Sequence, residues 1–158
     1  MKYTQLQTDL IKNLDRKKQE RFFYDYDGEN YILISNNFML CKCFKPLVVV
    51  DFERLNKLEP GSYQRKDLKQ FTVNSIDNFG CILDDEYREI KNTGNIVIKN
   101  KDSFLKLKDE KTTAYINIKN LKYFDKDCTF YVKNSFSAIL IFERNSYCGL
   151  VMPARVIE

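Results

Sequence analysis

The C-terminal third of the chain decides its fold, and residues 113–156 run TAYINIKNLKYFDKDCTFYVKNSFSAILIFERNSYCGLVMPARV. The first of these residues alternate between apolar and polar side chains, as a half-buried strand does, and the apolar spacing then becomes helical. Three apolar runs rich in β-branched and aromatic residues follow, with turn-forming residues between them. The segment therefore predicts a strand over 114–118, a short helix over 119–124, and strands over 128–132, 138–143 and 147–151.

The rest of the chain contains similar elements. Apolar residues at intervals of three and four predict an amphipathic helix over 3–19. The pair Asp27-Gly28 is a strong hairpin signal, and Asp51 can cap a short helix over 52–58. Apolar runs predict strands over 22–26, 31–35, 38–44, 47–50, 71–76, 79–83, 94–98 and 104–107.

These elements predict an α+β fold, with antiparallel sheets and a few short helices. The length of 158 residues suits a single domain that buries its own core. A strand followed by a short helix and a meander recurs along the chain, which predicts repeated strand-helix-meander units. The expected half-repeats cover about 1–45, 46–110 and 111–158.

The composition is that of a globular protein, with 26 Lys and Arg against 22 Asp and Glu, and a net charge of +4. The apolar run 47–50, like every other apolar run in the chain, is far too short to span a membrane. The first residues also lack the apolar core of a secretory signal. We therefore expect a cytoplasmic protein that does not associate with membranes.

The chain contains no histidine, which excludes Ser–His and Cys–His nucleophilic pairs. No pair of carboxylates stands in a recognisable catalytic context, so we expect a non-enzymatic protein without a cofactor or a metal. The densest acidic cluster, Asp84-Asp85-Glu86, is interpreted as a solvated turn, with a divalent-metal site as the alternative.

The cysteines form no C-x-x-C pair, and their number is odd. We expect reduced thiols at strand positions, and the alternative is a zinc ion held by four scattered thiols. Cys41 and Cys43 lie two residues apart, so on a strand they point to the same face. The five cysteines are Cys41, Cys43, Cys81, Cys128 and Cys148.

Residues 114–156 resemble the C-terminal part of bacterial DNA polymerase sliding clamps. The most specific element is the tail 151–156, which follows the Val-Met-Pro-x-Arg-aliphatic ending of that family. The serine-containing turn 134–138 and the strand with its shortened helix match as well. The resemblance covers about a quarter of the chain, which has room for one clamp-type domain and a further half, whereas a clamp chain has three.

The resemblance implies a clamp-like arrangement in which helices carry basic residues that follow duplex DNA through its phosphates. A solvated helix face would have the same composition, and basic residues near a helix C-terminus are favoured by the helix dipole in any case. The implied DNA-binding residues are Lys12, Arg16 and Lys17 on the first helix, Arg54 and Lys57 on the second, and Lys119, Lys122 and Lys126 on or after the third.

The resemblance also implies a peptide pocket beside the tail, bordered by Val151, Met152, Pro153 and Arg155. A flexible methionine next to a rigid proline suits an adaptable apolar groove. The alternative is that these residues only complete a sheet, with the proline ending the ladder of hydrogen bonds at an edge.

The leading hypothesis is a non-enzymatic, clamp-like protein, encoded by a phage or a mobile element, that binds duplex DNA or a replication protein. A ring would need many copies of the chain, so a homo-oligomer is one expected form and a monomer is the other. The alternative is a small protein–protein interaction domain with no nucleic-acid role. A further alternative is a single-strand binder that stacks bases on exposed aromatic residues, the candidates being Phe22, Phe23, Tyr24 and Tyr26.

Overall fold

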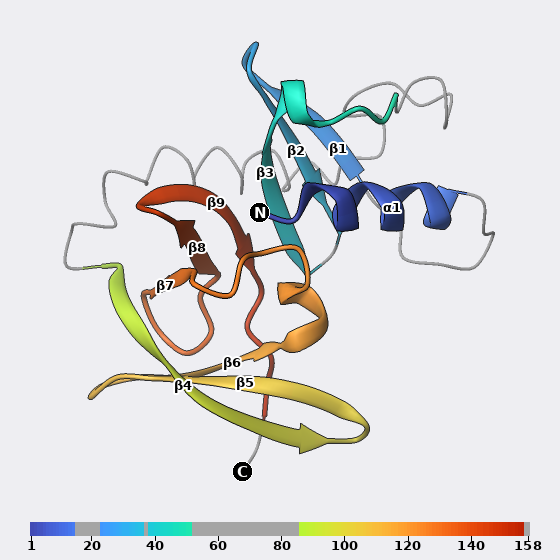
Figure 1. Cartoon of the computed structure of the whole chain (residues 1–158). Coiled ribbons are helices and arrows are strands. Elements are labelled where there is room, and N and C mark those ends of the chain that lie inside the picture. The colour runs from blue at the N-terminus through green and yellow to red at the C-terminus, as the bar shows by residue number, and fades with distance from the viewer. Residues whose placement is uncertain (15–22, 37, 52–85, 157–158) are drawn as a thin grey trace.

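The computed structural model describes residues 1–14, 23–36, 38–51 and 86–156 (Figure 1). These residues form one nine-stranded antiparallel sheet with one short α-helix, so the described part of the protein is mostly β. The strand order is β1-β2-β3-β9-β8-β7-β4-β5-β6. The elements are α1 (Tyr3–Leu14), β1 (Phe23–Asp27), β2 (Tyr31–Ser35), β3 (Met39–Phe44), η1 (Lys45–Leu47), β4 (Arg88–Lys99), β5 (Asp102–Lys108), β6 (Thr113–Asn117), η3 (Ile118–Leu121), β7 (Thr129–Val132), β8 (Ile139–Glu143) and β9 (Ser146–Val151).

Two meanders from opposite ends of the chain join at the centre of this sheet. The first consists of β1, β2 and β3, and the second of β7, β8 and β9. Their inner strands pair directly, with Leu40 of β3 opposite Leu150 of β9. The N-terminal and C-terminal segments therefore share one hydrogen-bonded ladder.

The long strand β4 connects the meanders to the β5–β6 hairpin. Its first residues pair with β7, with Ile90 opposite Phe130. Its last residues pair with β5, and the register shifts between Asn92 and Ile96. Gly94 lies within this irregularity at φ +71, a left-handed conformation that glycine adopts without strain. In Figure 1 the strand accordingly sweeps away from β7 to the outer margin of the molecule.

After β9 the chain runs to β6, the strand at one end of the strand order. The backbone N–H of Ala154 donates a hydrogen bond of 2.7 Å to the carbonyl oxygen of Tyr115 in β6. Six strands and this tail thus form a continuous circuit of hydrogen-bonded neighbours, β9-β8-β7-β4-β5-β6-tail. The C-terminal tail passes β6 in Figure 1 for this reason.

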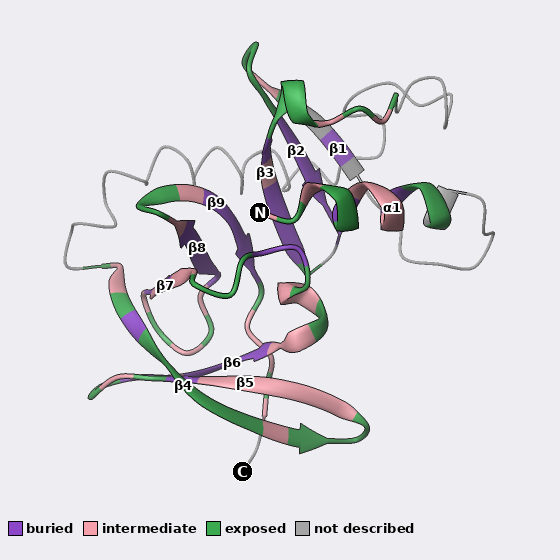
Figure 2. Ribbon diagram, viewed as in Figure 1, coloured by how far each residue is buried: buried purple, intermediate pink, exposed green. Residues whose placement is uncertain are grey.

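Apolar side chains are buried on both faces of the sheet, and Figure 2 shows the buried positions concentrated in its central strands. Successive side chains of a strand point to opposite faces, so Met39 and Cys41 belong to the main core and Leu40 to the second cluster. The helix α1 contributes Leu6 and Leu10 to the main core, which are 0% and 1% exposed. The second cluster consists of Leu33, Leu40, Ala138, Leu140, Phe142 and Leu150.

Most strand predictions within the described residues are confirmed. The strand over 31–35 has the predicted bounds, and the strands at 39–44, 102–108, 113–117, 129–132, 139–143 and 146–151 overlap the predicted ones. The helix predicted over 3–19 is confirmed as far as Leu14, and residues 15–19 lie outside the described residues. The predicted helix 52–58 and the predicted strands 71–76 and 79–83 also lie outside them.

The prediction of a buried strand over 47–50 is wrong. Residues Lys45–Leu47 form a 3₁₀ turn, and Val49 is 85% exposed. The backbone of this segment is hydrogen-bonded to the side chain of Gln7 in α1. This side chain donates to the carbonyl oxygen of Leu47 and accepts the N–H of Val49. Hydrogen bonds to the Gln7 side chain thus take the place of the hydrogen bonds to a neighbouring strand that the apolar run predicted.

The prediction of a short helix over 119–124 is confirmed only in part. The segment makes a single 3₁₀ turn, Ile118–Leu121, which Asn117 caps by accepting the N–H of Lys119 at 3.0 Å. Tyr123 and Phe124 are both about 1% exposed, and two adjacent side chains enter the core together more easily from an irregular segment than from a helix.

The described residues contain no repeated strand-helix-meander units. The strand β6 pairs with β5, and the meander that follows it in sequence lies elsewhere in the strand order. No helix in the described part of the chain is long and apolar enough to cross a membrane.

Candidate functional site

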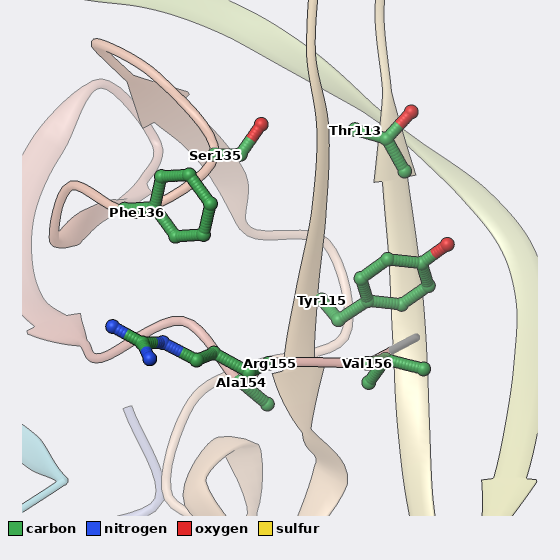
Figure 3. A pocket seen from close by; sticks show the side chains of 7 residues that line it. All are labelled: Thr113, Tyr115, Ser135, Phe136, Ala154, Arg155 and Val156. Carbon is green, nitrogen blue, oxygen red and sulfur yellow. The ribbon is translucent and has the colours of Figure 1, made fainter. Parts of the chain in front are cut away.

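A pocket of about 560 Å³ opens beside β6, where three segments distant in sequence meet (Figure 3). The strand, the turn between β7 and β8, and the C-terminal tail each contribute part of its wall. The lining residues are Thr113, Tyr115, Ser135, Phe136, Ala154, Arg155 and Val156.

The turn between β7 and β8 is held by its own polar side chains. The Asn134 Oδ1 atom accepts the backbone N–H groups of Phe136 and Ser137, each at 2.9 Å. The Ser137 hydroxyl oxygen accepts the N–H of Lys133 at 3.0 Å. These hydrogen bonds pair the backbone N–H groups of the turn without any contribution from the Phe136 side chain. That side chain is 73% exposed at the rim of the pocket.

The tail is fixed by backbone bonds at alternate residues. Met152 donates its N–H to the carbonyl oxygen of Phe38 at 2.8 Å, and Ala154 donates to Tyr115 at 2.7 Å. Pro153 between them has no N–H to leave unsatisfied. This anchoring brings Arg155 and Val156 to the pocket wall.

The pocket is apolar with a positive rim. Arg155 is the one charged residue among its lining residues, and Figure 3 shows its guanidinium on the same side as Phe136, with Tyr115 and Val156 across from them. The Lys106 ammonium lies 5.7 Å from the centroid of the Tyr115 ring. Such a site can hold an apolar side chain between two aromatic rings and an anionic group at the guanidinium.

The four residues predicted to border a peptide pocket occupy different environments. Arg155 lines the pocket, whereas Val151 is fully buried in the main core, opposite Met39 and Ile139. Met152 is 36% exposed and Pro153 is half-buried, and neither lines the pocket.

Sequence reasoning missed the remaining lining residues. Phe136 offered a signal, since an aromatic residue between two serines in a turn is exposed unless the turn folds over the core. The sequence contains no such signal for Tyr115 and Thr113. Strand alternation predicts which side chains share a face of the strand, but not which segment packs against that face.

Half of the predicted DNA-binding residues are described. Lys12 and Lys126 are exposed. Lys119 forms an ion pair with Asp102 at 2.6 Å, and Lys122 forms one with Asp9 of α1 at 2.9 Å. The other predicted contacts, Arg16, Lys17, Arg54 and Lys57, lie outside the described residues.

The pair Lys122–Asp9 ties α1 to the segment after β6. Partial burial by itself would raise the pKa of Asp9, but hydrogen bonds from Lys122, Tyr123 and Gln5 hold that pKa below its usual value. Lys122 also lies 4.7 Å from the ring centroid of Tyr123, whose hydroxyl donates to Asp9 at 3.0 Å. The contacts of Lys122 therefore stabilise the fold.

The cysteines of the described residues are free thiols. Cys41 and Cys43 point to the same face of β3, as predicted, and both belong to the main core. Burial raises the pKa of Cys43 to about 12 and that of Cys128 to about 11, and it also raises the pKa values of Cys41 and Cys148. No group of three or more Cys, Asp or Glu side chains suited to a metal occurs in the part of the chain that the structure describes.

The aromatic residues predicted to stack on bases and the acidic cluster 84–86 each lie only partly within the described residues. Tyr24 is buried in the main core, whereas Tyr26 is 38% exposed, and the side chains of Phe22 and Phe23 lie outside the described residues. Of the acidic cluster, only Glu86 is described, and it forms an ion pair with Lys133.

The chain was compared with protein-family models, with curated proteins and with solved structures, and none of them matches it.

Proposed function

We propose that this protein is a non-enzymatic binding module that takes an extended segment of a partner protein into the pocket beside β6. The observation that carries the proposal is the position of the pocket, which combines apolar side chains with the outer edge of β6, next to the point where the tail bonds to Tyr115. Extended peptides bind to such edges by adding a strand, with side-chain pockets supplying specificity.

The geometry of β6 supports a backbone-mediated contact. The carbonyl of Tyr115 accepts from Ala154 of the tail, so it faces away from β5. Backbone groups along an antiparallel strand point alternately to its two edges, so the N–H and C=O of Thr113 face the same way as those of Tyr115. Thr113 is itself a lining residue, and its backbone is therefore presented beside the pocket.

The side chains around this edge suit a bulky apolar residue of the partner. The rings of Tyr115 and Phe136 form opposite walls, and Ala154 and Val156 complete the apolar surface. A pocket of this volume accommodates one or two side chains, and rigid aromatic walls lose little entropy on binding.

The clamp resemblance leads to a finer form of the same proposal, in which the partner is a replication protein. The tail that carries the resemblance contributes Ala154, Arg155 and Val156 to the pocket. Duplex DNA is the weaker candidate because Lys119 and Lys122 are already engaged in ion pairs with Asp102 and Asp9.

The test is a selection of phage-displayed random linear peptides on the full chain, followed by binding measurements with the enriched peptides as synthetic probes. Replacing Phe136 with serine should weaken their binding at least about tenfold, which corresponds to about 1.4 kcal/mol. The matched control is Val49→Ser, since Val49 is 85% exposed and lies away from the pocket.

Enrichment of peptides that bind both variants equally would refute the pocket as the site, and so would a failure to enrich any sequence. A parallel titration with duplex DNA at low and high salt examines the rival function. Salt-dependent DNA binding without peptide binding would replace the proposal by the DNA-binding alternative.

A further inference from the structure

We infer that two copies of this chain pair through the outer edge of β4, at residues 96–98. Ile96 is 57% exposed and Ile98 is 76% exposed, although both belong to a regular strand (Figure 2). An apolar strand at the edge of a sheet is a template for pairing with another strand unless something covers it.

Within the part of the chain that the structure describes, no strand pairs with the outer edge of the second half of β4. The strand pairs with β7 only at Arg88–Ile90, and from Ile96 onward its one partner among the described residues is β5. The irregularity between Asn92 and Ile96 turns the strand away from β7. In Figure 1 this half of β4 accordingly lies at the margin of the molecule, with β5 on one side only.

The turn of the hairpin shows which backbone groups face outward. Asn100 and Lys101 have φ values of 51° and 70°, the left-handed pair of a two-residue hairpin turn, and Lys99 lies opposite Asp102. The pair next to such a turn exchanges both of its hydrogen bonds within the hairpin, and so does every second pair after it, including Val97 with Phe104. The N–H and C=O groups of Ile96 and Ile98 therefore point to the outer edge.

The outer edge of β4 at residues 96–98 can pair with the same edge of a second copy. In an antiparallel pair with its two-fold axis at Val97, Ile96 lies opposite the partner's Ile98, and Ile98 lies opposite the partner's Ile96. Both opposed pairs have outward-facing backbone groups, so each exchanges two hydrogen bonds, while Val97 occupies the non-hydrogen-bonded position on the axis. The four isoleucine side chains then share one face of the joined sheet and cover one another.

The charged residue next to the isoleucines, Lys99, does not oppose a like charge in this pairing. In the same register Lys99 lies opposite the partner's Asn95, so no two lysines oppose each other across the new ladder. An unrelated strand could form the same backbone bonds, but a second copy pairs the backbone groups, covers the isoleucines and opposes no like charges in one register. Closed two-fold pairing also leaves no free β4 edge that would continue into a filament.

The test is sedimentation equilibrium of the full chain over protein concentrations from about 1 μM to about 1 mM. The mass should rise with concentration from 18.8 kDa towards twice that value. The variants Ile96→Lys and Ile98→Glu should each raise the dimer dissociation constant at least about tenfold. Val49→Lys is the control for a charge at an exposed apolar position, and it should leave the constant unchanged.

The double variant Ile96→Lys with Ile98→Glu tests the register. In the proposed register the introduced lysine of one copy faces the introduced glutamate of the other. The double variant should therefore dimerise more tightly than either single variant, and added salt should weaken it. Amide exchange adds a backbone readout, with the amides of Ile96 and Ile98 gaining protection with concentration while that of Val97 does not change.

A chain that stays at monomer mass throughout overturns the inference. Unchanged dimerisation of Ile98→Glu also overturns it, because the dimer would then use another surface. A double variant no better than the single ones rules out the register centred on Val97.

Discussion

The backbone of Gly149 lies so close to the carbonyl oxygen of Leu40 that a Cβ atom at Gly149 would come within 2.1 Å of that oxygen. On the same glycine, the ring of Phe124 lies 3.0 Å from the position of that Cβ. Gly149 is opposite Cys41 at the junction of β3 and β9, where the two meanders join. A glycine at this one position therefore permits the close contact that unites the N-terminal and C-terminal parts of the sheet.

Replacing Gly149 with alanine should destabilise the protein by about 2 kcal/mol or more, because backbone rather than a flexible side chain must move. The melting temperature should fall by about 5 °C or more, measured by circular dichroism. Gly94→Ala is the matched control, since Gly94 also has a positive φ but no atom within 4 Å of its added Cβ. Equal losses in the two variants would mean that backbone strain, and not the contact with Leu40, accounts for the effect.

Replacing Ile116 with aspartate should cost about 3–5 kcal/mol in the free energy of unfolding, since Ile116 is 0% exposed in β6 and a charge there has no partner. Urea denaturation measures the loss. Val49→Asp places the same charge on an exposed residue and should change stability by less than about 0.5 kcal/mol. A tolerated aspartate at 116 would contradict the placement of β6 against the core.

The pair Asp9–Lys122 predicts a loss of stability in acid. A carboxyl group whose pKa is lowered by folding contributes stability above its unfolded pKa, and this stability disappears as the pH falls through the folded value. Asp9→Asn should therefore lower the free energy of unfolding by about 1 kcal/mol at neutral pH and reduce its decline between about pH 5 and pH 2. The measurement is urea unfolding at a series of pH values.

The control for this series is Glu29→Gln, because Glu29 is exposed in the turn between β1 and β2. It should leave the pH dependence close to that of the unchanged protein. If Asp9→Asn preserves the full acid dependence, the hydrogen bonds of Asp9 do not contribute to stability.

The buried thiols should resist alkylation in the native state. Thiolate is the reactive form, and burial raises the pKa of Cys43 to about 12, so almost none is present at pH 8. Cys41, Cys43 and Cys148 should react with iodoacetamide at least about tenfold more slowly in native than in denaturing buffer. Mass spectrometry of peptides reports each cysteine separately, and rapid native labelling of Cys41 would contradict its place in the core.

Local pattern was sufficient to identify most of the described strands. The strand over 31–35 was predicted to the residue because Asp27-Gly28 marks the turn before it, and its apolar residues are buried on both faces. The meander β7–β8–β9 was predicted for the same reason, since its turn residues and apolar runs alternate along the chain. Even so, one extra residue, Cys148, lies between the pairs Ile141–Gly149 and Phe142–Tyr147, and this bulge was not predictable from alternation.

The candidate site was only partly predictable. The tail motif drew attention to Arg155, which lines the pocket, but it also included Val151, which is buried in the core. Tyr115 and Phe136 are separated from the tail by many residues. The hydrogen bond from Ala154 to Tyr115 joins the tail to β6, and the turn that carries Phe136 completes the pocket wall.

The sequence by itself determined where most of the described strands lie, and the bounds of the strand 31–35, because side-chain alternation and turn preference act over a few neighbouring residues. The tertiary structure alone decided which strands are neighbours, and whether an apolar run such as 47–50 becomes a strand. Gln7 satisfies the backbone of Leu47 and Val49, and Tyr115 receives the tail at Ala154. These outcomes depend on the pairing of backbone polar groups between segments far apart in the chain, and no local pattern contains that information.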